Sequence, residues 1–403
     1  MGRAALGSAL VAVLVVVPAS GAAAGAAPGG GDRRLLQQAA DDLTALGVTG
    51  VQGITAEGHR TSTARSGVAD IRTGAPVPDN GYFRMGSNTK TFAAVIVLQL
   101  VAEGRLSLDD SVDRWLPGVV SGTGNDGRRV TVRQLLQHTS GIYNYTNDLT
   151  GLSSPEEYLE RRFEHLDPEE LVAMAMKHEP AFAPGTSWDY SNTNYILVGM
   201  IIEKITGKGW ASVVGERVIR PPGLRQTYSP GDVPTLPRPY AKGYQQFEPG
   251  GPLVDTTLLN MSWGWVAGDL VTTPTDLVRF WRALQGGRLL PPRQMAEMHR
   301  TVLAVTFQDA FPGTRYGSGS CGHPRPAAGT GTTAGRARHQ HRQRRDQRRE
   351  PRGGARHHHA ARRRRGARQL PPGGPGGGRS SLLRGSSPAV TTSDSSERSG
   401  CVT

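Results

Sequence analysis

Residues 83–90 read FRMGSNTK, and the apolar run 92–101 that follows them, FAAVIVLQLV, has close to helical spacing. The pattern predicts a buried helix that begins near Ser87 and is capped by Gly104. Lys90 lies three residues after Ser87, so the two side chains share one helix face. The start of a helix favours negative charge. The stretch therefore offers a serine nucleophile, a lysine base that burial can activate, and an electrophilic helix end.

The pattern Ser-x-x-Lys is short and also arises by chance in proteins without such a site. Ser87 with Lys90 is its only match in this chain, which is poor in lysine. The apolar run behind the pair supports the catalytic interpretation, because it predicts that the helix is buried.

The first 27 residues have the order of a secretory signal peptide. Arg3 precedes the apolar segment 4–17, and a run of small residues follows at 22–27. The apolar segment is too short to span a membrane as a helix, and no second such segment follows. The sequence therefore predicts a signal peptide over residues 1–27 and a secreted protein without a transmembrane anchor. We also expect a monomer.

The formal net charge of +13 comes from the C-terminal part of the chain. Residues 336–403 contain 17 arginines, no lysine and four acidic residues, whereas the rest of the chain holds equal numbers of basic and acidic residues. No nucleic-acid partner is therefore expected for the globular part. From Gly317 onward the chain has no aromatic residue, Ile, Met, Lys or Asn. This composition predicts a catalytic domain over 33–316 and a disordered basic tail over 317–403.

The two cysteines, Cys321 and Cys401, both lie in this tail. Export allows a disulfide between them, but two such distant thiols do not establish one. No residues have the spacing of metal ligands, and we expect neither a metal nor a cofactor.

Periodicity and turn residues divide the rest of the chain into short elements. The predicted strands and helices are strands over 48–54 and 60–68 and helices over 32–45, 132–137, 169–177, 188–205, 273–284 and 292–299. Residues 143–165 are polar and aromatic, and we interpret them as a surface excursion.

A second candidate motif, Tyr190-Ser191-Asn192, opens the strongly apolar helix that is predicted to be central. A tyrosine phenol near a lysine can carry a proton to a leaving group, and an asparagine amide can bind a substrate carbonyl. The segment from Tyr145 to Asn147 matches the same pattern, but we interpret it as loop. The alternative for Tyr190 is a tyrosine packed in the core at a helix start.

In this order and spacing, the motifs resemble those of the serine penicillin-recognising enzymes. They are most similar to secreted D-alanyl-D-alanine carboxypeptidases of the class C β-lactamase group. The resemblance covers about residues 35–317. It rests on Ser87-x-x-Lys90, Tyr190-x-Asn192, the turn HTSG at 138–141, the helix exit at 104–106, and the segment 262–268 with Ser262-Trp263 and Ala267-Gly268.

The resemblance implies an α/β fold, with an antiparallel sheet flanked by helices and a helical domain that holds the second motif. It implies acylation of Ser87 by a small peptide or a β-lactam, with Lys90 and Tyr190 sharing the proton transfers. Asn192 would orient the acyl side chain, and Trp263 would contact the substrate. The backbone N–H of Ser87 would be one oxyanion donor.

The family has a third motif, Lys/His-x-Gly, on a later sheet strand, and this chain does not contain it as written. Segments 323–325 and 333–335 are poor substitutes. A reading frame one base earlier would let Gly329–Gly335 encode Tyr-Gly-His-Asp-Gly-Gly, so our hypothesis is a frameshift between about Tyr316 and Gly329. The C-terminal part of the sheet would then be missing, and we expect the chain as printed to fold poorly and to have little activity.

Several functions remain open on the same residues. The first prediction is a D-alanyl-D-alanine carboxypeptidase, and a β-lactamase, a D-aminopeptidase or an esterase could use the same groups. From a different class, the tail could make this a non-catalytic secreted protein that binds polyanions through 336–368, with weak metal chelation by 357–359. Salt-sensitive binding that survives Ser87→Ala and is lost without 336–403 would favour that alternative.

Overall fold

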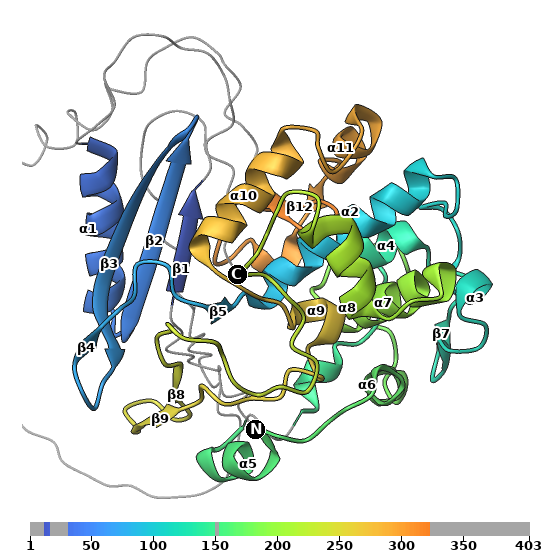
Figure 1. Cartoon of the computed structure of the whole chain (residues 1–403). Helices are drawn as coiled ribbons and strands as arrows, with labels where there is room; N and C mark the ends of the chain where they lie inside the picture. Colours follow the sequence, from blue (N-terminus) through green and yellow to red (C-terminus); the bar gives the residue numbers. More distant parts are fainter. Residues whose placement is uncertain (1–11, 17–30, 150–152, 323–403) are drawn as a thin grey trace, which may run out of the picture. The chain divides into compact units, whose positions relative to one another are not determined.

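A computed structural model describes residues 12–16, 31–149 and 153–322 (Figure 1). Its α-helices are α1 Gly31–Ala45, α2 Thr89–Ala102, α3 Val112–Trp115, α4 Val132–Gln137, α5 Pro155–Arg161, α6 Pro168–Met176, α7 Thr193–Thr206, α8 Trp210–Val214, α9 Trp265–Gly268, α10 Pro274–Gln285 and α11 Pro292–Met298. Its strands are β1 Ala12–Val16, β2 Gly50–Glu57, β3 Arg60–Asp70, β4 Ala75–Pro76, β5 Phe83–Arg84, β6 Ser121–Gly122, β7 Asn125–Asp126, β8 Tyr244–Gln246, β9 Leu253–Asp255, β10 Val271–Thr272, β11 Val302–Leu303, β12 Arg315–Tyr316 and β13 Cys321–Gly322.

The largest sheet has the order β1-β2-β3-β4, and its long hairpin is antiparallel. Strands β2 and β3 pair from Gly50 with Gly67 to Glu57 with Arg60, so the two residues between them form the turn. Helix α1 covers one face of this hairpin and α10 covers the other (Figure 1). The antiparallel sheet flanked by helices is therefore confirmed.

Strand β1 falls within the predicted signal peptide. Ala12–Val16 pairs in parallel with β2, with Ala12 opposite Val51 and Val16 opposite Thr55. Parallel pairing gives β2 a neighbour on each side, and β2 is buried along most of its length, as expected of an interior strand. A strand of the sheet was not expected in this apolar segment.

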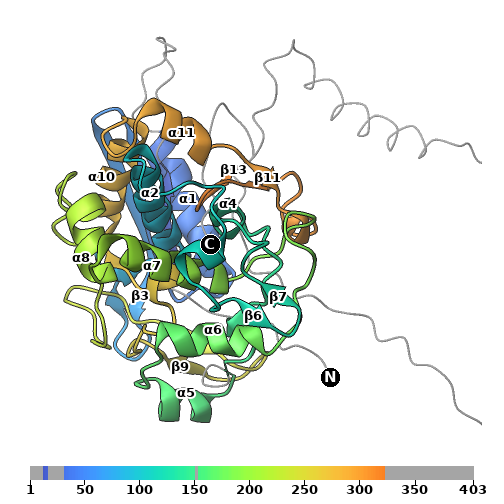
Figure 2. The ribbon, with the colours of Figure 1, turned by 90° about the vertical axis from the view of Figure 1, so that its right-hand side faces the viewer.

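Helix α2 lies at the centre of the helical part. Its side chains from Phe92 to Leu98 are fully buried, and the ring of Phe92 stacks on Phe280 of α10 at 3.9 Å between centroids. Helix α7 is buried in the same cluster and contacts α2, with α8 and α10 beside them (Figure 2). A helix that is hydrophobic all round must be covered on all sides, which is what the apolar run of α2 predicts.

Three details differ from the sequence-based expectations. Residues 188–192 lie outside any helix, and α7 begins at Thr193 with Asn192 as its N-cap. The predicted surface excursion 143–165 includes Tyr145, whose side chain is fully buried. The structure also continues past residue 316, because β13 pairs antiparallel with β12 and Ser318 is buried between them.

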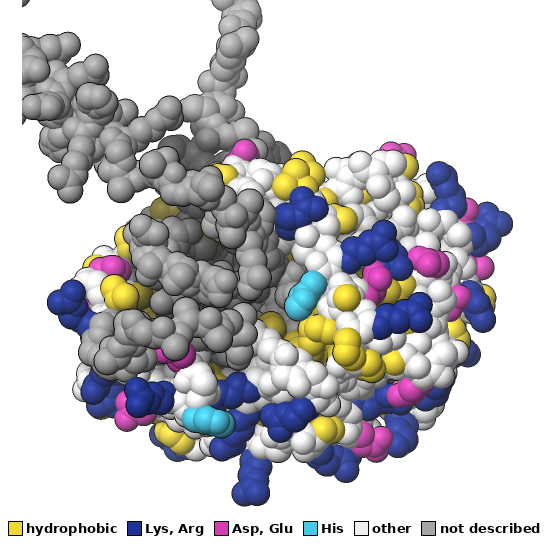
Figure 3. Space-filling view, turned by 90° about the horizontal axis from the view of Figure 1, so that it is seen from above, with side chains coloured by type: hydrophobic (Ala, Val, Ile, Leu, Met, Phe, Trp, Pro, Cys, Tyr) yellow, Lys and Arg dark blue, Asp and Glu magenta, His cyan; other side chains and the backbone are white. Residues whose placement is uncertain are grey.

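Charged side chains of both signs are interspersed on one face of the described structure. Lys and Arg alternate with Asp and Glu over the face seen from above (Figure 3). This agrees with the balance of charges outside residues 336–403. Within the described ranges, no helix is both long and apolar enough to cross a bilayer.

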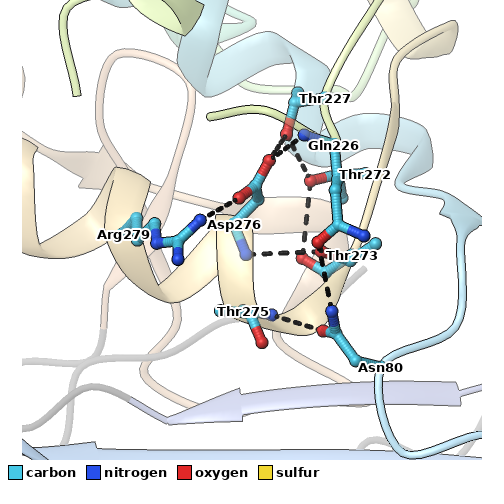
Figure 4. A network of polar contacts seen from close by, with 8 residues as sticks. All are labelled: Asn80, Gln226, Thr227, Thr272, Thr273, Thr275, Asp276 and Arg279. Carbon is cyan, nitrogen blue, oxygen red and sulfur yellow. Dashed lines mark hydrogen bonds and ion pairs between the residues drawn. The ribbon is translucent and has the colours of Figure 1, made fainter. Parts of the chain in front are cut away.

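A buried polar network fixes the start of α10 against the chain that leads to Ser87 (Figure 4). The carboxylate of Asp276 is fully buried and accepts hydrogen bonds from the backbone N–H of Gln226 at 2.6 Å and the hydroxyl of Thr227 at 3.0 Å. Thr227 also bonds Thr272 of β10, which pairs with β5. The network therefore ties α10, a loop and the β5–β10 ladder together.

We expect Asp276→Ala to lower the free energy of unfolding by about 3 kcal/mol, because it leaves the N–H of Gln226 and the hydroxyl of Thr227 without their acceptor. Arg279→Gln is the matched control: it removes the ion pair at 3.0 Å on the exposed side of the same carboxylate and should cost less than about 1 kcal/mol. Urea unfolding of the two variants measures both values. Equal losses would contradict the prediction.

Candidate active site

Ser87 lies on a short turn between two anchored segments. The ladder of β5 with β10 precedes it, and the backbone N–H of Met85 donates to the carbonyl of Leu270 at 2.9 Å. Gly86 has a φ of +51°, a left-handed conformation that lets the chain turn from the strand into the 3₁₀ turn Gly86–Asn88. Helix α2 follows directly. The serine is therefore held at the start of the buried helix, as predicted.

Lys90 is buried completely on the first turn of α2. Its Nζ donates three hydrogen bonds, to Ser87 Oγ at 3.0 Å, to Asn192 Oδ1 at 2.8 Å and to the carbonyl of Ala267 at 2.7 Å. Burial lowers the pKa of Lys90 well below its ordinary value, since the charged form loses its hydration. A lysine that gives up its proton more readily can accept one from the serine.

Tyr190 reaches the same serine from the segment before α7. Its hydroxyl donates to Ser87 Oγ at 2.7 Å, and the Lys90 Nζ lies 4.9 Å from the centre of its ring. Two groups able to carry a proton, a phenol and an amine, therefore both contact the serine oxygen.

Asn192 is turned toward the lysine. Its amide oxygen accepts from Lys90, and its backbone N–H donates to Asn144 Oδ1 at 3.0 Å. Its amide nitrogen lies 3.5 Å from Thr146 Oγ1. The structure thus joins Asn192 to the lysine, while its predicted role toward a substrate stays a prediction.

The second Tyr-x-Asn match lies beside the site and has a different task. Tyr145 is fully buried, its hydroxyl donates to the carbonyl of Trp263, and burial raises the pKa of its phenol. Trp263 packs its half-buried side chain against the main hydrophobic core. None of the described contacts joins Trp263 to Ser87, Lys90 or Tyr190, so its predicted contact with substrate stays a prediction.

Three groups near the serine were not predicted from the sequence as functional residues. Asn144 and the carbonyl of Ala267 hold Asn192 and Lys90, and the ring of His138 lies 4.4 Å from that of Tyr190. The turn of His138 and the pair Ala267-Gly268 were both part of the family resemblance, which gave neither a role in the site. A backbone carbonyl has no signature in a sequence.

The segment that carries Ala267 is anchored by a buried acid. Asp269 follows α9, and its carboxylate accepts hydrogen bonds from Trp210 Nε1 at 3.1 Å and from the hydroxyl of Ser229. Burial raises the pKa of Asp269 to about 7, although both hydrogen bonds oppose the shift. The acid therefore keeps its proton in the folded chain at pH values where the unfolded chain has lost it.

Because the folded state binds this proton more tightly, its stabilising contribution is full below pH 4 and is lost as the pH rises to about 7. In the unaltered chain, the free energy of unfolding should fall by up to about 4 kcal/mol across this window. We expect this fall to be absent in Asp269→Asn. Ser229→Ala should do the reverse and extend the window upward, since it removes a bond that lowers the pKa. Unfolding titrations from pH 4 to 8 check both, and parallel curves for all three chains would refute the prediction.

The chain that follows β12 passes against the catalytic helix. Gly319 has a φ of +75°, its carbonyl accepts from Thr91 Oγ1 at 2.6 Å, and a Cβ there would lie 2.7 Å from the carbonyl oxygen of Lys90. Only glycine fits this approach. The candidate third-motif segments 323–325 and 333–335 lie outside the described residues, as do 336–368 and 357–359. Among described side chains, no group of three or more His, Cys, Asp or Glu could hold a metal.

A model of the Beta-lactamase family matches residues 33–341 of this chain. The chain belongs to this family. The match covers the described residues of the site and extends past Gly322 into the basic segment. Members of the family are serine hydrolases, and penicillin-binding proteins are among the relatives, so the predicted recognition and fold are confirmed.

Curated relatives include penicillin-binding protein 4* of Bacillus subtilis, 31% identical over 44% of this chain and 38% of its own length. Esterase EstB of Burkholderia gladioli is 32% identical over 45% of this chain and 46% of its own length. Penicillin-binding protein 4 of Amycolatopsis lactamdurans is 30% identical over 63% of this chain and 66% of its own length. The aligned regions thus span from about two fifths to two thirds of these relatives.

Two solved structures are similar over more of their length. A D-stereospecific amidohydrolase from Streptomyces shares 41% identity and a TM-score of 0.68, covering 74% of this chain and 84% of that one. A D-amino acid amidase from Ochrobactrum anthropi shares 31% identity and a TM-score of 0.63, covering 73% and 82%. The relatives therefore include amidases and an esterase beside penicillin-binding proteins.

Proposed function

We propose that this serine hydrolase cleaves amide bonds next to a D-configured residue. The observation that carries the proposal is the 41% identity to the D-stereospecific amidohydrolase across 84% of that chain. The D-amino acid amidase, at 31% identity, supports the same substrate class. Of the activities considered from the sequence, that of a D-aminopeptidase is the most similar to this proposal.

The chemistry follows from the contacts around Ser87. Its Oγ would attack the carbonyl carbon, while its proton passes to the unprotonated amine of Lys90 or to the phenolate form of Tyr190. Transfer of that proton to the leaving nitrogen would break the C–N bond and release an amine, leaving an ester on Ser87. Water would then attack the ester and restore the serine. The backbone N–H of Ser87 is the expected oxyanion donor.

Hydrolysis of D- and L-phenylalanine amide by the full chain tests the substrate class. We expect the D-enantiomer to react at least about 100-fold faster in kcat/KM, a difference of about 3 kcal/mol in transition-state binding. Equal rates would contradict the proposal while leaving the serine chemistry intact. Ser87→Ala is the control that shows which hydrolysis belongs to this site.

A D-alanyl-D-alanine carboxypeptidase is the second candidate. It is favoured by the similarity to the penicillin-binding proteins at 30–31% identity. Release of D-alanine from an acylated D-alanyl-D-alanine peptide, with slow loss of bound penicillin, would support it. Rapid turnover of penicillin would instead indicate a β-lactamase, and cleavage of simple esters alone would indicate an esterase.

We further propose that the protein is exported and acts as a monomer. The order of charged, apolar and small residues in 1–27 supports export. N-terminal sequencing of protein from the culture medium should find a start near residue 28, and retention of Ala12–Val16 in the mature protein would argue against it. Light scattering measures the oligomeric state.

A further inference from the structure

We propose that His138 is a positioning residue that holds Tyr190 against Ser87 with a neutral imidazole. The turn HTSG at 138–141 belongs to the family resemblance, which assigns it no role. His138 ends α4 in a left-handed conformation, with φ of +59°, and its side chain is fully buried. A buried non-glycine residue in this conformation points to a specific requirement at the position.

His138 contacts three consecutive residues of the segment that precedes α7. Its carbonyl accepts from the backbone N–H of Asp189 at 3.1 Å, and its Nδ1 accepts from the backbone N–H of Ser191 at 3.3 Å. Between these two bonds, its ring packs 4.4 Å from the ring of Tyr190 at an angle of 36°. The backbone on both sides of the tyrosine and the tyrosine ring are therefore held by one residue.

The rest of the turn fixes the orientation of the imidazole. Asn194 donates from Nδ2 to His138 Nδ1 at 3.2 Å, and its Oδ1 accepts from the hydroxyl of Ser140 at 2.7 Å. Because a backbone N–H can only donate, Nδ1 must be the acceptor, and the proton of the neutral ring lies on Nε2. Nε2 is buried without a hydrogen-bond partner among the described residues. Thus the ring is aligned through Nδ1 and through its faces.

The surroundings require the ring to be uncharged. Tyr190, Tyr195, Tyr316 and Trp188 lie around it, at 4.4, 5.4, 4.8 and 6.0 Å between ring centroids. Burial, and then the positive charge of Lys90, lower the pKa of His138 well below its ordinary value. No carboxylate contributes to that shift, so a second positive charge beside the lysine would be uncompensated. A neutral ring leaves Lys90 and Tyr190 as the groups that exchange protons with the serine.

Two substitutions separate positioning from general stability. His138→Asn keeps an acceptor near the place of Nδ1 and tolerates the left-handed backbone, whereas His138→Leu removes both the acceptor and the ring. Phe280→Leu, a core substitution on α10 away from Tyr190, is the control for lost packing. The readout is the burst of nitrophenol when the full chain is acylated by nitrophenyl acetate.

We expect His138→Leu to slow acylation about 30- to 100-fold with less than a threefold change in KM, as for a misplaced proton carrier. His138→Asn should stay within about fivefold of the unaltered chain. The pH midpoint of acylation should shift in His138→Leu, because Tyr190 is no longer held at a fixed distance from Lys90, and should stay constant in Phe280→Leu. The titratable groups that face the imidazole are Lys90 on α2, Tyr190 in the segment before α7, Tyr195 on α7 and Tyr316 on β12.

A second measurement needs no turnover. The phenol titration of Tyr190, taken as the ultraviolet difference between each chain and the same chain with Tyr190→Phe, should shift in His138→Leu and not in Phe280→Leu. The proposal is overturned if His138→Leu and His138→Asn are equally slow, or if the losses of all three variants follow only their folded fractions. It is also overturned if the titration of Tyr190 is the same with and without His138.

Discussion

Ser87→Ala is expected to abolish acylation of the chain, with a loss of at least about 10⁴-fold in the nitrophenol burst. The serine oxygen is contacted by both Lys90 Nζ and the Tyr190 hydroxyl, at 3.0 and 2.7 Å. Alanine removes this atom but leaves the amine and the phenol in place. Any residual reaction then comes from groups that cannot form the acyl ester.

Covalent labelling tests this prediction through the acyl ester itself. Mass spectrometry of the chain treated with penicillin should find one added molecule, located on Ser87, and none on Ser87→Ala. Ser66→Ala is the matched control, since Ser66 lies on β3 with its hydroxyl bonded to Asp41. Labelling of the Ser87→Ala chain at another residue would show that the nucleophile is wrong. The added molecule is seen when release of the acyl group is slower than acylation. If the chain turns penicillin over rapidly and stays unlabelled, the nitrophenol burst is the deciding measurement.

The contact between Ser87 and Lys90 could be predicted from sequence, because it depends only on their spacing along the chain. Ser87 and Lys90 are three residues apart at the start of one apolar run, and helix geometry alone brings their side chains together. Tyr190 is 103 residues from Ser87 in the chain, so its contact with the serine depends on how α2 and α7 pack. The preference for Tyr190 over Tyr145 rested on the helix that follows it, and the structure places Tyr190 on the serine.

Other features could not be predicted for physical reasons. Tyr145 lies among polar neighbours, so its burial depends on tertiary packing that a periodicity argument does not see. The apolar pattern of α7 runs back to Trp188, although the helix begins only at Thr193. Boundaries are the least determined part of a pattern. The end of the catalytic domain was placed at 316 by composition, whereas two further residues, Cys321 and Gly322, pair with β12.

The frameshift hypothesis remains a prediction, because residues 323–403 lie outside the described structure. The DNA that encodes 315–337 decides it. A single-base correction that restores Tyr-Gly-His-x-Gly would supply the third motif and remove the excess charge. A confirmed reading frame would direct attention to whether the printed chain folds well enough to turn over substrate.

Lys90→Met should have two effects: it should remove activity, and it should change how the free energy of unfolding depends on pH. Methionine is unbranched and of similar length, so it fills the buried space of the lysine stem without the amine. Acylation should fall about 10²- to 10⁴-fold, because Ser87 loses a proton acceptor and Tyr190 loses the positive charge 4.9 Å from its ring. The nitrophenol burst measures this loss. Lys242→Met, a substitution of a lysine that pairs with Asp255 far from the serine, should leave acylation unchanged.

The stability effect has a defined sign. The pKa of Lys90 is lower in the folded chain than in the unfolded chain. The unfolded chain therefore binds this proton more tightly, and the bound proton lowers the free energy of unfolding. The free energy of unfolding of the unaltered chain should therefore rise with pH as the solution approaches the ordinary pKa of 10.5, and this rise should be absent in Lys90→Met. Consequently, methionine is most favourable relative to lysine at low pH, and its advantage shrinks as the pH increases. Identical slopes for the two chains between pH 7 and 10 would mean that Lys90 keeps an ordinary proton affinity when folded, and that it does not act as the base for Ser87.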